Sequence, residues 1–266
     1  MDPIQAIILA LVQGLTEFLP VSSSGHLILV PRFLGWPDQG LAFDVAVHMG
    51  TLAAVIAYFR RDLGALIRGW LRSVGGRPAT DESRLAWSII VAAIPVAIAG
   101  LLAKDYIEGH LRDSPYAIAG ALAFFGLLLW LADRWGRRTL EVTEVTWKRA
   151  LTIGLAQALS LIPGTSRSGV TMTAGLALGL TRTAAARFSF LLAVPSIGMA
   201  GAYEGLQVVR SQEAVDWHSM GLGALVAAVG GFLCIHFFMR LIQRIGMAPF
   251  VIYRWILAAL VIYALA

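Results

Sequence analysis

The stretch EFLPVSSSGH, residues 17–26, places a carboxylate, a proline, three serines and a histidine inside an apolar segment. That segment, residues 3–34, is too long for one straight helix across a bilayer and is interrupted near its centre. A second apolar segment, residues 149–180, is interrupted in the same way by SLIPGTSRSG, residues 160–169. Each segment is therefore predicted to form a re-entrant pair of half-helices joined by a polar break.

The composition of the whole chain is that of a membrane protein. Of its 266 residues, 58% are hydrophobic and 14% are charged, which leaves too little polar surface for a soluble domain of this length. Six further apolar runs have the length of a transmembrane helix, at residues 41–60, 85–103, 115–133, 186–206, 219–239 and 249–266. We therefore expect an all-α integral membrane protein with six transmembrane helices and two re-entrant helix pairs.

Lysine and arginine are distributed unevenly among the connections between these runs. Residues 60–84 and 134–149 carry eleven of them, whereas residues 104–114 and 207–218 carry three. The positive-inside rule then predicts that the first two connections are cytoplasmic and the other two external. The same topology explains the net charge of +5, so no nucleic-acid partner is predicted.

The two broken segments are also similar in sequence. QGLTEFLPVSSSG, residues 13–25, aligns with QALSLIPGTSRSG, residues 157–169, through a shared glutamine, leucine, proline, serine pair and final glycine. With the opposite orientations given by the charges, this predicts one membrane domain, residues 1–266, built from inverted repeats at about 1–133 and 149–266. The two breaks would then meet near the middle of the membrane and share a polar cavity.

Each break precedes a segment that is expected to be helical, so two helix N-termini would point into that cavity. Free backbone N–H groups and the helix dipole favour anions there, and Arg167 adds donors suited to phosphate. Phosphate is the anion that these features favour. The small residues predicted to bring bare backbone to the anion are Ser22, Ser23, Ser24, Gly25, Gly164, Thr165, Ser166, Ser168 and Gly169.

Groups able to do chemistry lie beside the first break. Gln13 and Glu17 are four residues apart and should share a helix face. His26 follows the three serines closely enough to act as a base toward one of them, or to attack phosphorus itself. Asp44 and His48 are weaker candidates, either as supporting residues or as residues near the interface.

The sequence around both breaks resembles a known family. QGLTEFLPVSSSGH, residues 13–26, and PGTSRSGVT, residues 163–171, are similar to the two signature motifs of undecaprenyl-diphosphate phosphatases of the bacitracin-resistance type. The stretches FDVAVHMGTLAAV, FSFLLAVP and PFVIYRW, which start at residues 43, 188 and 249, also resemble that family.

The resemblance implies hydrolysis of undecaprenyl diphosphate to undecaprenyl phosphate and inorganic phosphate, which recycles a lipid carrier for cell-wall synthesis and confers bacitracin resistance. It also implies a divalent cation, Mg²⁺ or Ca²⁺, and action at the outer face of a bacterial plasma membrane. By motif, the implied site residues are Gln13, Glu17, Ser23, His26, Ser166, Arg167 and Thr171.

From these residues we expect Ser23 to be the nucleophile and His26 its base, with a phosphohistidine at His26 as the rival mechanism. Glu17 is the expected metal ligand, and Arg167 is expected to bind the transferring phosphoryl group. A transporter or lipid flippase is the alternative function, because broken helices in inverted repeats are also typical of secondary transporters. The sequence leaves open whether the chain forms a homodimer.

Overall fold

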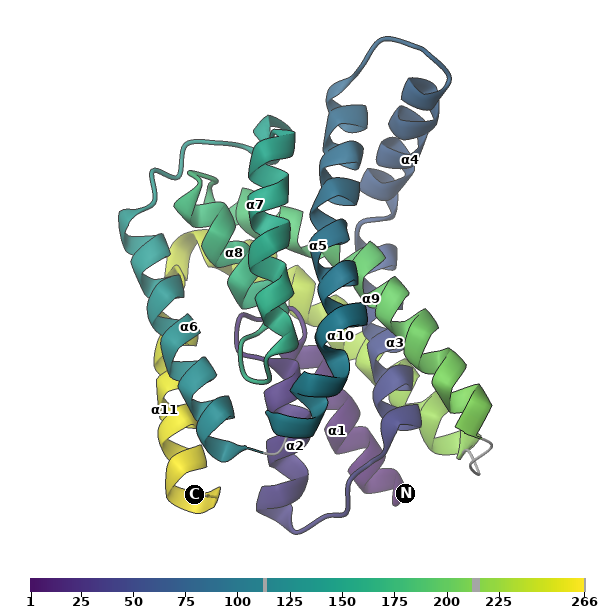
Figure 1. Cartoon of the computed structure of the whole chain (residues 1–266), viewed down its shortest axis with the longest axis vertical. Helices are drawn as coiled ribbons and strands as arrows, with labels where there is room; N and C mark the ends of the chain where they lie inside the picture. The colour runs from purple at the N-terminus through teal and green to yellow at the C-terminus, as the bar shows by residue number, and fades with distance from the viewer. Residues whose placement is uncertain (112–113, 212–215, 266) are drawn as a thin grey trace.

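The computed structural model describes residues 1–111, 114–211 and 216–265, without the side chains of 104–108 and 265 (Figure 1). These residues form eleven α-helices and two short 3₁₀-helices. The elements are α1 (Pro3–Thr16), α2 (Ser23–Leu34), α3 (Leu41–Tyr58), α4 (Arg60–Val74), α5 (Asp81–His110), α6 (Pro115–Trp135), η1 (Val142–Glu144), α7 (Trp147–Ala158), η2 (Leu159–Leu161), α8 (Arg167–Ala177), α9 (Arg182–Ser211), α10 (Trp217–Ile245) and α11 (Ala248–Leu265).

The expected all-α membrane protein is confirmed. In the described part of the chain, α3, α5, α6, α9 and α10 are long and apolar enough to cross a bilayer. The sixth predicted span corresponds to α11, which is a shorter apolar helix, so the count of six spans stays a prediction. Parts of the two arginine-poor connections, residues 112–113 and 212–215, lie outside the described residues.

The segment 60–84, interpreted from its charges as a connection only, contains the helix α4. Leu66 and Gly69 of α4 are buried, and Gly69 packs closely on Ser83 at the start of α5. Asp62 also forms an ion pair with Arg187 of α9. The result is a helical hairpin of α4 and α5 that projects from one end of the molecule (Figure 1).

Both predicted breaks are present. The first separates α1 from α2, and the second separates α7 and η2 from α8. In Figure 1 the two connecting loops lie side by side near the middle of the molecule. The opposite membrane orientations of the two halves remain predictions.

Helices of one half of the chain pack against helices of the other half, so the two halves do not form separate bundles. The helix α1 packs on α10, whereas its counterpart α7 packs on α5; in the same way α3 packs on α10 and α9 on α5. Glycine permits close approach at these crossings, because a Cβ on Gly14 of α1 would lie 2.9 Å from the carbonyl oxygen of Ala227 in α10. Small residues at such crossings are typical of membrane helices.

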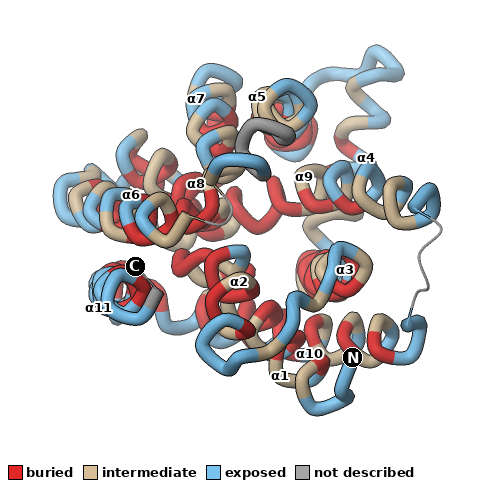
Figure 2. Tube along the Cα trace, turned by 60° about the horizontal axis from the view of Figure 1, so that its bottom comes forward, coloured by how far each residue is buried: buried red, intermediate tan, exposed pale blue. Residues whose placement is uncertain are grey.

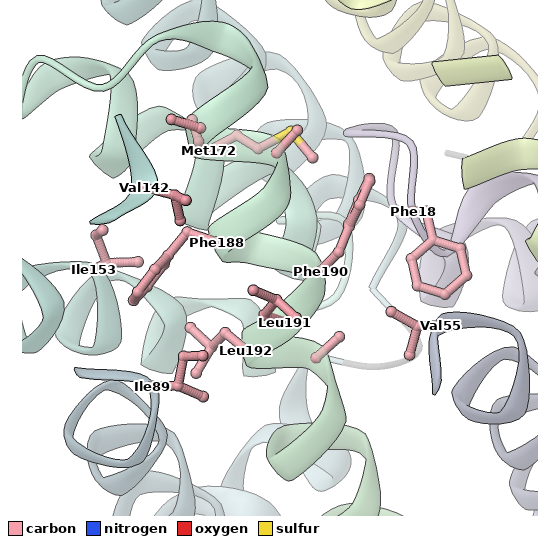
Figure 3. Packing of buried hydrophobic residues seen from close by; sticks show 14 of the residues in the cluster. Phe18, Val55, Ile89, Val142, Ile153, Met172, Phe188, Phe190, Leu191 and Leu192 are labelled. Atoms are coloured by element: carbon pink, nitrogen blue, oxygen red, sulfur yellow. The ribbon is translucent and has the colours of Figure 1, made fainter. Parts of the chain in front are cut away.

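The buried core surrounds α9, whose residues Phe188, Phe190, Leu191 and Leu192 are all buried (Figure 3). Burial on every side is typical of a central helix, and Figure 2 shows the buried residues concentrated around α2, α8 and α9. Phe18, from the first break, packs edge-to-face on Phe190 with ring centroids 5.4 Å apart. This contact anchors the loop that follows Glu17 to the core.

Candidate active site between the two broken helices

The two breaks end in the same serine turn. Ser22 precedes α2 with φ 76°, and its Oγ accepts a hydrogen bond from the N–H of Gly25. Ser166 precedes α8 with φ 74°, and its Oγ accepts from the N–H of Gly169. A positive φ is uncommon for a residue other than glycine, so its occurrence at both aligned serines marks two copies of one local structure.

Direct contacts join the two loops. Ser168 Oγ donates to the carbonyl oxygen of Leu19 at 2.8 Å. The backbones of Gly25 and Gly164 also lie close together, since a Cβ on Gly25 would be 3.9 Å from the Cα of Gly164. The N-terminus of α2 and the N-terminus of α8 are therefore held next to each other.

Arg254 of α11 binds both loops from behind and is only 1% exposed. Its Nη1 donates to the carbonyl oxygens of Pro20 (3.2 Å) and Thr165 (3.0 Å), and its Nη2 to that of Gly164 (3.0 Å). Nε and Nη2 also donate to the carbonyls of Leu122 and Ala121 in α6, at 3.0 and 3.2 Å respectively. One guanidinium group thus fixes the backbone of both breaks relative to α6.

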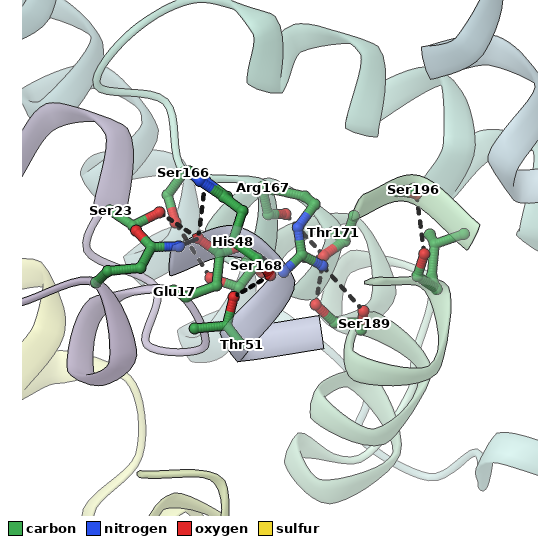
Figure 4. A network of polar contacts seen from close by, with 12 residues as sticks. Glu17, Ser23, His48, Thr51, Ser166, Arg167, Ser168, Thr171, Ser189 and Ser196 are labelled. Carbon is green, nitrogen blue, oxygen red and sulfur yellow. Dashed lines mark hydrogen bonds and ion pairs between the residues drawn. The ribbon is translucent and has the colours of Figure 1, made fainter. Parts of the chain in front are cut away.

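Glu17 is the centre of the polar network drawn in Figure 4. Its carboxylate is 6% exposed and accepts hydrogen bonds from Arg167 Nη2 at 3.0 Å, Gln13 Nε2 at 3.1 Å and Ser23 Oγ. Arg167 in turn donates to the carbonyl oxygen of Ser189 at 3.3 Å. The first break supplies the serine and the carboxylate, and the second supplies the arginine.

This network opens into a cavity of about 510 Å³. Among the residues predicted for the site, those that line it are Glu17, Ser23, Ser24, Ser166 and Arg167. The serine next to a buried carboxylate and an arginine is an arrangement that can deprotonate a nucleophile and bind an anion.

His26 occupies a different position from the one expected of a base for Ser23. Its Nδ1 lies 2.6 Å from the carbonyl oxygen of Ser22, and its Nε2 lies 2.7 Å from the hydroxyl of Tyr253. Because a carbonyl oxygen only accepts, Nδ1 carries the proton and Nε2 accepts from Tyr253 in the neutral ring. Both nitrogens are therefore occupied, and the group that accepts from Ser23 is Glu17.

Most of the other predicted site residues build the loops rather than line the cavity. Gln13 is fully buried behind Glu17, and the hydroxyl of Thr171 lies 2.7 Å from Ser189 Oγ and 2.8 Å from the carbonyl oxygen of Arg167. The remaining predicted residues outside the cavity lining are Ser22, Gly25, His26, Gly164, Thr165, Ser168 and Gly169.

Titratable residues outside the two motifs also line the cavity. His48 Nδ1 lies 2.7 Å from the carbonyl oxygen of Asp44, and its Nε2 lies 3.8 Å from Glu17 Oε2. Asp44 and Glu204 of α9 also line the cavity. The four-residue spacing signals Asp44 and His48 in the sequence, whereas no such spacing signals Glu204 near the end of its apolar run.

The cavity offers oxygen donors to a divalent cation but no preformed cluster of ligands among the described residues. In the described part of the chain, no three His, Cys, Asp or Glu side chains converge on one point. However, Gln13 Oε1 is buried beside Glu17 without a hydrogen-bond partner, and the carboxylates of Asp44 and Glu204 line the same cavity. Mg²⁺ usually binds one or two carboxylates together with substrate phosphates, so Glu17 with Gln13 Oε1 beside it fits a cation that arrives with the substrate.

Fold and site together define an integral membrane protein with a Ser–carboxylate–Arg site buried between two broken helices. Residues 6–260 match the family described as "Bacitracin resistance protein BacA". The chain therefore belongs to the BacA family.

Relatives match over nearly the whole chain. "Undecaprenyl-diphosphatase 2" of Stutzerimonas stutzeri (strain A1501) is 58% identical over 265 residues, which cover 98% of each chain. "Undecaprenyl-diphosphatase" of Teredinibacter turnerae (strain ATCC 39867 / T7901) is 56% identical, covering 99% of this chain and 100% of the relative. "Undecaprenyl-diphosphatase 1" of Pseudoalteromonas translucida (strain TAC 125) is 53% identical, covering 97% and 96%.

Proposed function

We propose that this protein is a membrane phosphatase that hydrolyses undecaprenyl diphosphate to undecaprenyl phosphate and inorganic phosphate. The observation that carries the proposal is the hydrogen bond from Ser23 Oγ to a Glu17 carboxylate that is itself paired with Arg167 of the other loop. The names of the relatives, which describe undecaprenyl-diphosphatases, support this substrate. The product is the lipid carrier used in cell-wall synthesis, and its recovery would confer the bacitracin resistance after which the family is named.

In the first step, Ser23 Oγ attacks the terminal phosphorus while its proton passes to Glu17. A bond forms between Oγ and phosphorus, the bond to the bridging oxygen breaks, and undecaprenyl phosphate leaves with the electron pair. In the second step, water attacks the phosphoserine, the bond from phosphorus to Oγ breaks, and Glu17 returns its proton to Oγ. Inorganic phosphate leaves with the oxygen and both hydrogens of the water.

Arg167 and the first N–H groups of α2 and α8 stabilise negative charge on the transferring phosphoryl group. Once a phosphate enters, Arg167 can bind Glu17 and a phosphate oxygen with different nitrogens of its planar fork. Low dielectric strengthens each of these interactions, because the site is buried within the membrane domain.

Glu17, with Gln13 Oε1 beside it, would hold Mg²⁺ or Ca²⁺, and the substrate diphosphate would supply further oxygens. When bound, the cation supplies positive charge against the diphosphate. We also propose an orientation in the membrane. The distribution of arginine and lysine supports a plasma-membrane protein whose cavity opens to the outer, periplasmic face. A homodimer is compatible with this arrangement but is not required by the site.

The decisive experiment measures phosphate release by purified protein in detergent with Mg²⁺ present. Wild type should release phosphate from undecaprenyl diphosphate, Ser23→Ala should lose nearly all turnover, and His26→Ala should retain a large share of it. Trapping a phosphoserine by rapid acid quench would identify the intermediate. The assignment is wrong if Ser23→Ala keeps near-normal turnover while His26→Ala loses it, and release of no phosphate by wild type would favour a transporter.

A further inference from the structure

The cavity that contains Ser23 has apolar as well as polar lining. Its apolar lining includes Leu27 and Ile28 of α2 and a stripe of α5 residues, Val96, Ala97, Gly100 and Leu101. Leu27 is four residues after Ser23, so it continues the same face of α2 away from the nucleophile. An apolar wall that starts one helical turn from the reacting serine fits a ligand with an apolar chain attached to its phosphate.

The α5 side of this wall is open at Gly100. A Cβ built on Gly100 would have no atom within 4 Å, although the residue lines the cavity. The neighbouring residues Leu101 and Leu102 are 74% and 83% exposed, as expected of side chains that face lipid. Gly100 therefore lies where the cavity wall meets the lipid-facing surface of α5.

The cavity is far too small for a whole undecaprenyl chain. With about 510 Å³, it can enclose the diphosphate and the first few isoprene units, and the rest of the chain must leave it. A second apolar groove, between α6 and α11 around Gly120, has no lining residue in common with the cavity. The apolar wall that starts next to the reacting serine points to an exit between α2 and α5.

We propose that Leu27 and Ile28 of α2, with Ala97 and Gly100 of α5, bind the first isoprene units of the lipid, and that the chain enters the bilayer past Gly100. This inference rests on the proposed phosphatase function and adds the residues that recognise the lipid. Gly100 is about 28 Å along α5 from Asp81, at 1.5 Å per residue, so it lies near the end of the membrane domain opposite the α4–α5 hairpin. In the proposed orientation, that end of the membrane domain lies in the outer leaflet.

A tryptophan at position 100 should fill the exit without disturbing the backbone, because the space around Gly100 is empty. For Gly100→Trp we expect the KM for undecaprenyl diphosphate to rise at least about tenfold, equivalent to about 1.4 kcal/mol. The inhibition constant of inorganic diphosphate, which has no chain, should stay within about twofold of wild type. Gly120→Trp is the matched control, since Gly120 is also helical and unobstructed but lies in the other groove, and it should behave as wild type.

A labelling experiment measures access to position 100 without requiring enzyme turnover. Gly100→Cys should react with a maleimide, whereas the native Cys234 is buried. Undecaprenyl diphosphate should slow the labelling of Gly100→Cys, inorganic diphosphate should not, and neither should affect Gly120→Cys.

The outcomes separate the two proposals. If wild type releases no phosphate from undecaprenyl diphosphate, the proposed function fails. The chain does not pass Gly100 if wild type is active but Gly100→Trp and Gly120→Trp have the same KM for undecaprenyl diphosphate. The same conclusion follows if Gly100→Trp raises the inhibition constant of inorganic diphosphate as much as the KM for the lipid. Equal protection of both cysteines by the lipid would overturn the exit as well.

Discussion

Replacing Arg254 by methionine removes five hydrogen-bond donors from behind the two loops while keeping a flexible apolar side chain of similar length. The carbonyls of Ala121 and Leu122 lie inside α6 and keep their helical partners. The carbonyls of Pro20, Gly164 and Thr165 lie in the loops and have no other hydrogen bond among the described residues. Three buried acceptors are therefore left without a donor.

A buried polar group that loses its partner costs about 1–3 kcal/mol. Three such groups give roughly 3 kcal/mol at the lower limit, and relaxation of the loops keeps the loss near that limit. For domains of 150–250 residues, 1 kcal/mol shifts Tm by roughly 2–4 °C, so Arg254→Met should lower Tm by about 6–12 °C. Turnover should fall too, because both loops carry site residues.

The assay is thermal unfolding of purified protein in detergent, followed by tryptophan fluorescence, with phosphate release measured on the same samples. Arg254→Lys should be intermediate, since lysine keeps the charge but has three donors instead of five. Arg134→Met is the matched control, because Arg134 is an exposed arginine at the end of α6. A Tm for Arg254→Met within about 2 °C of the control, with normal turnover, would refute the positioning role.

Two further predictions concern single carboxylates. Glu17→Gln keeps the size of the side chain but cannot take the proton of Ser23, so kcat should fall by about 10²–10⁴-fold in the phosphate-release assay; an unchanged kcat would exclude Glu17 as the base. Asp216 caps α10 by accepting from Ser219 and from the N-terminal ammonium group of Met1, and these donors lower its pKa from 3.8 to about 2. Because the pKa of Asp216 is lower in the folded state, its ionised form stabilises the folded α10 N-terminus above the unfolded pKa, and this stabilisation is lost as the pH falls through the folded pKa. Protection of these amides in hydrogen exchange, corrected for intrinsic rates, should therefore be constant above about pH 4 and decline toward pH 2. Asp216→Ala should remove that pH dependence, and a decline beginning near pH 6 would point to another group.

The local geometry of the two breaks could be predicted because it depends on short-range chemistry. The serines that align between residues 13–25 and 157–169 are the two residues with matching positive φ and matching caps. The meeting of the two breaks also predicts that Glu17 and Arg167 share one cavity. Their direct ion pair was not predicted, because Glu17 was assigned to a metal and Arg167 to the phosphoryl group.

The position of His26 could not be predicted in the same way. Its distance in sequence from Ser23 is three residues, which on a regular helix places both side chains on one side. The outcome depends instead on Tyr253, 227 residues further along the chain, whose hydroxyl lies 2.7 Å from Nε2. No local pattern contains that partner.

Two other features carried sequence signals of different kinds. Within α4, Leu63, Leu66, Gly69 and Trp70 are apolar or small residues at a spacing typical of an amphipathic helix. The arginines between them were interpreted as marks of a connection. Arg254 is a lone arginine in an apolar run, which signals a functional or structural charge in a membrane. Its partners are backbone carbonyls, and a sequence does not show which carbonyls lack a donor.

The charges of the site also explain why neither half of the chain can hold it alone. Glu17 and Arg167 are both largely removed from solvent, and a buried charge without its partner is destabilising by several kcal/mol, on the order of 3–5. The pair forms only when the two loops meet, and Arg254 of the last helix stabilises that meeting by binding the backbone of both. Assembly of the nucleophile with its carboxylate and arginine is therefore coupled to completion of the fold, so that a partly assembled chain would lack the active constellation.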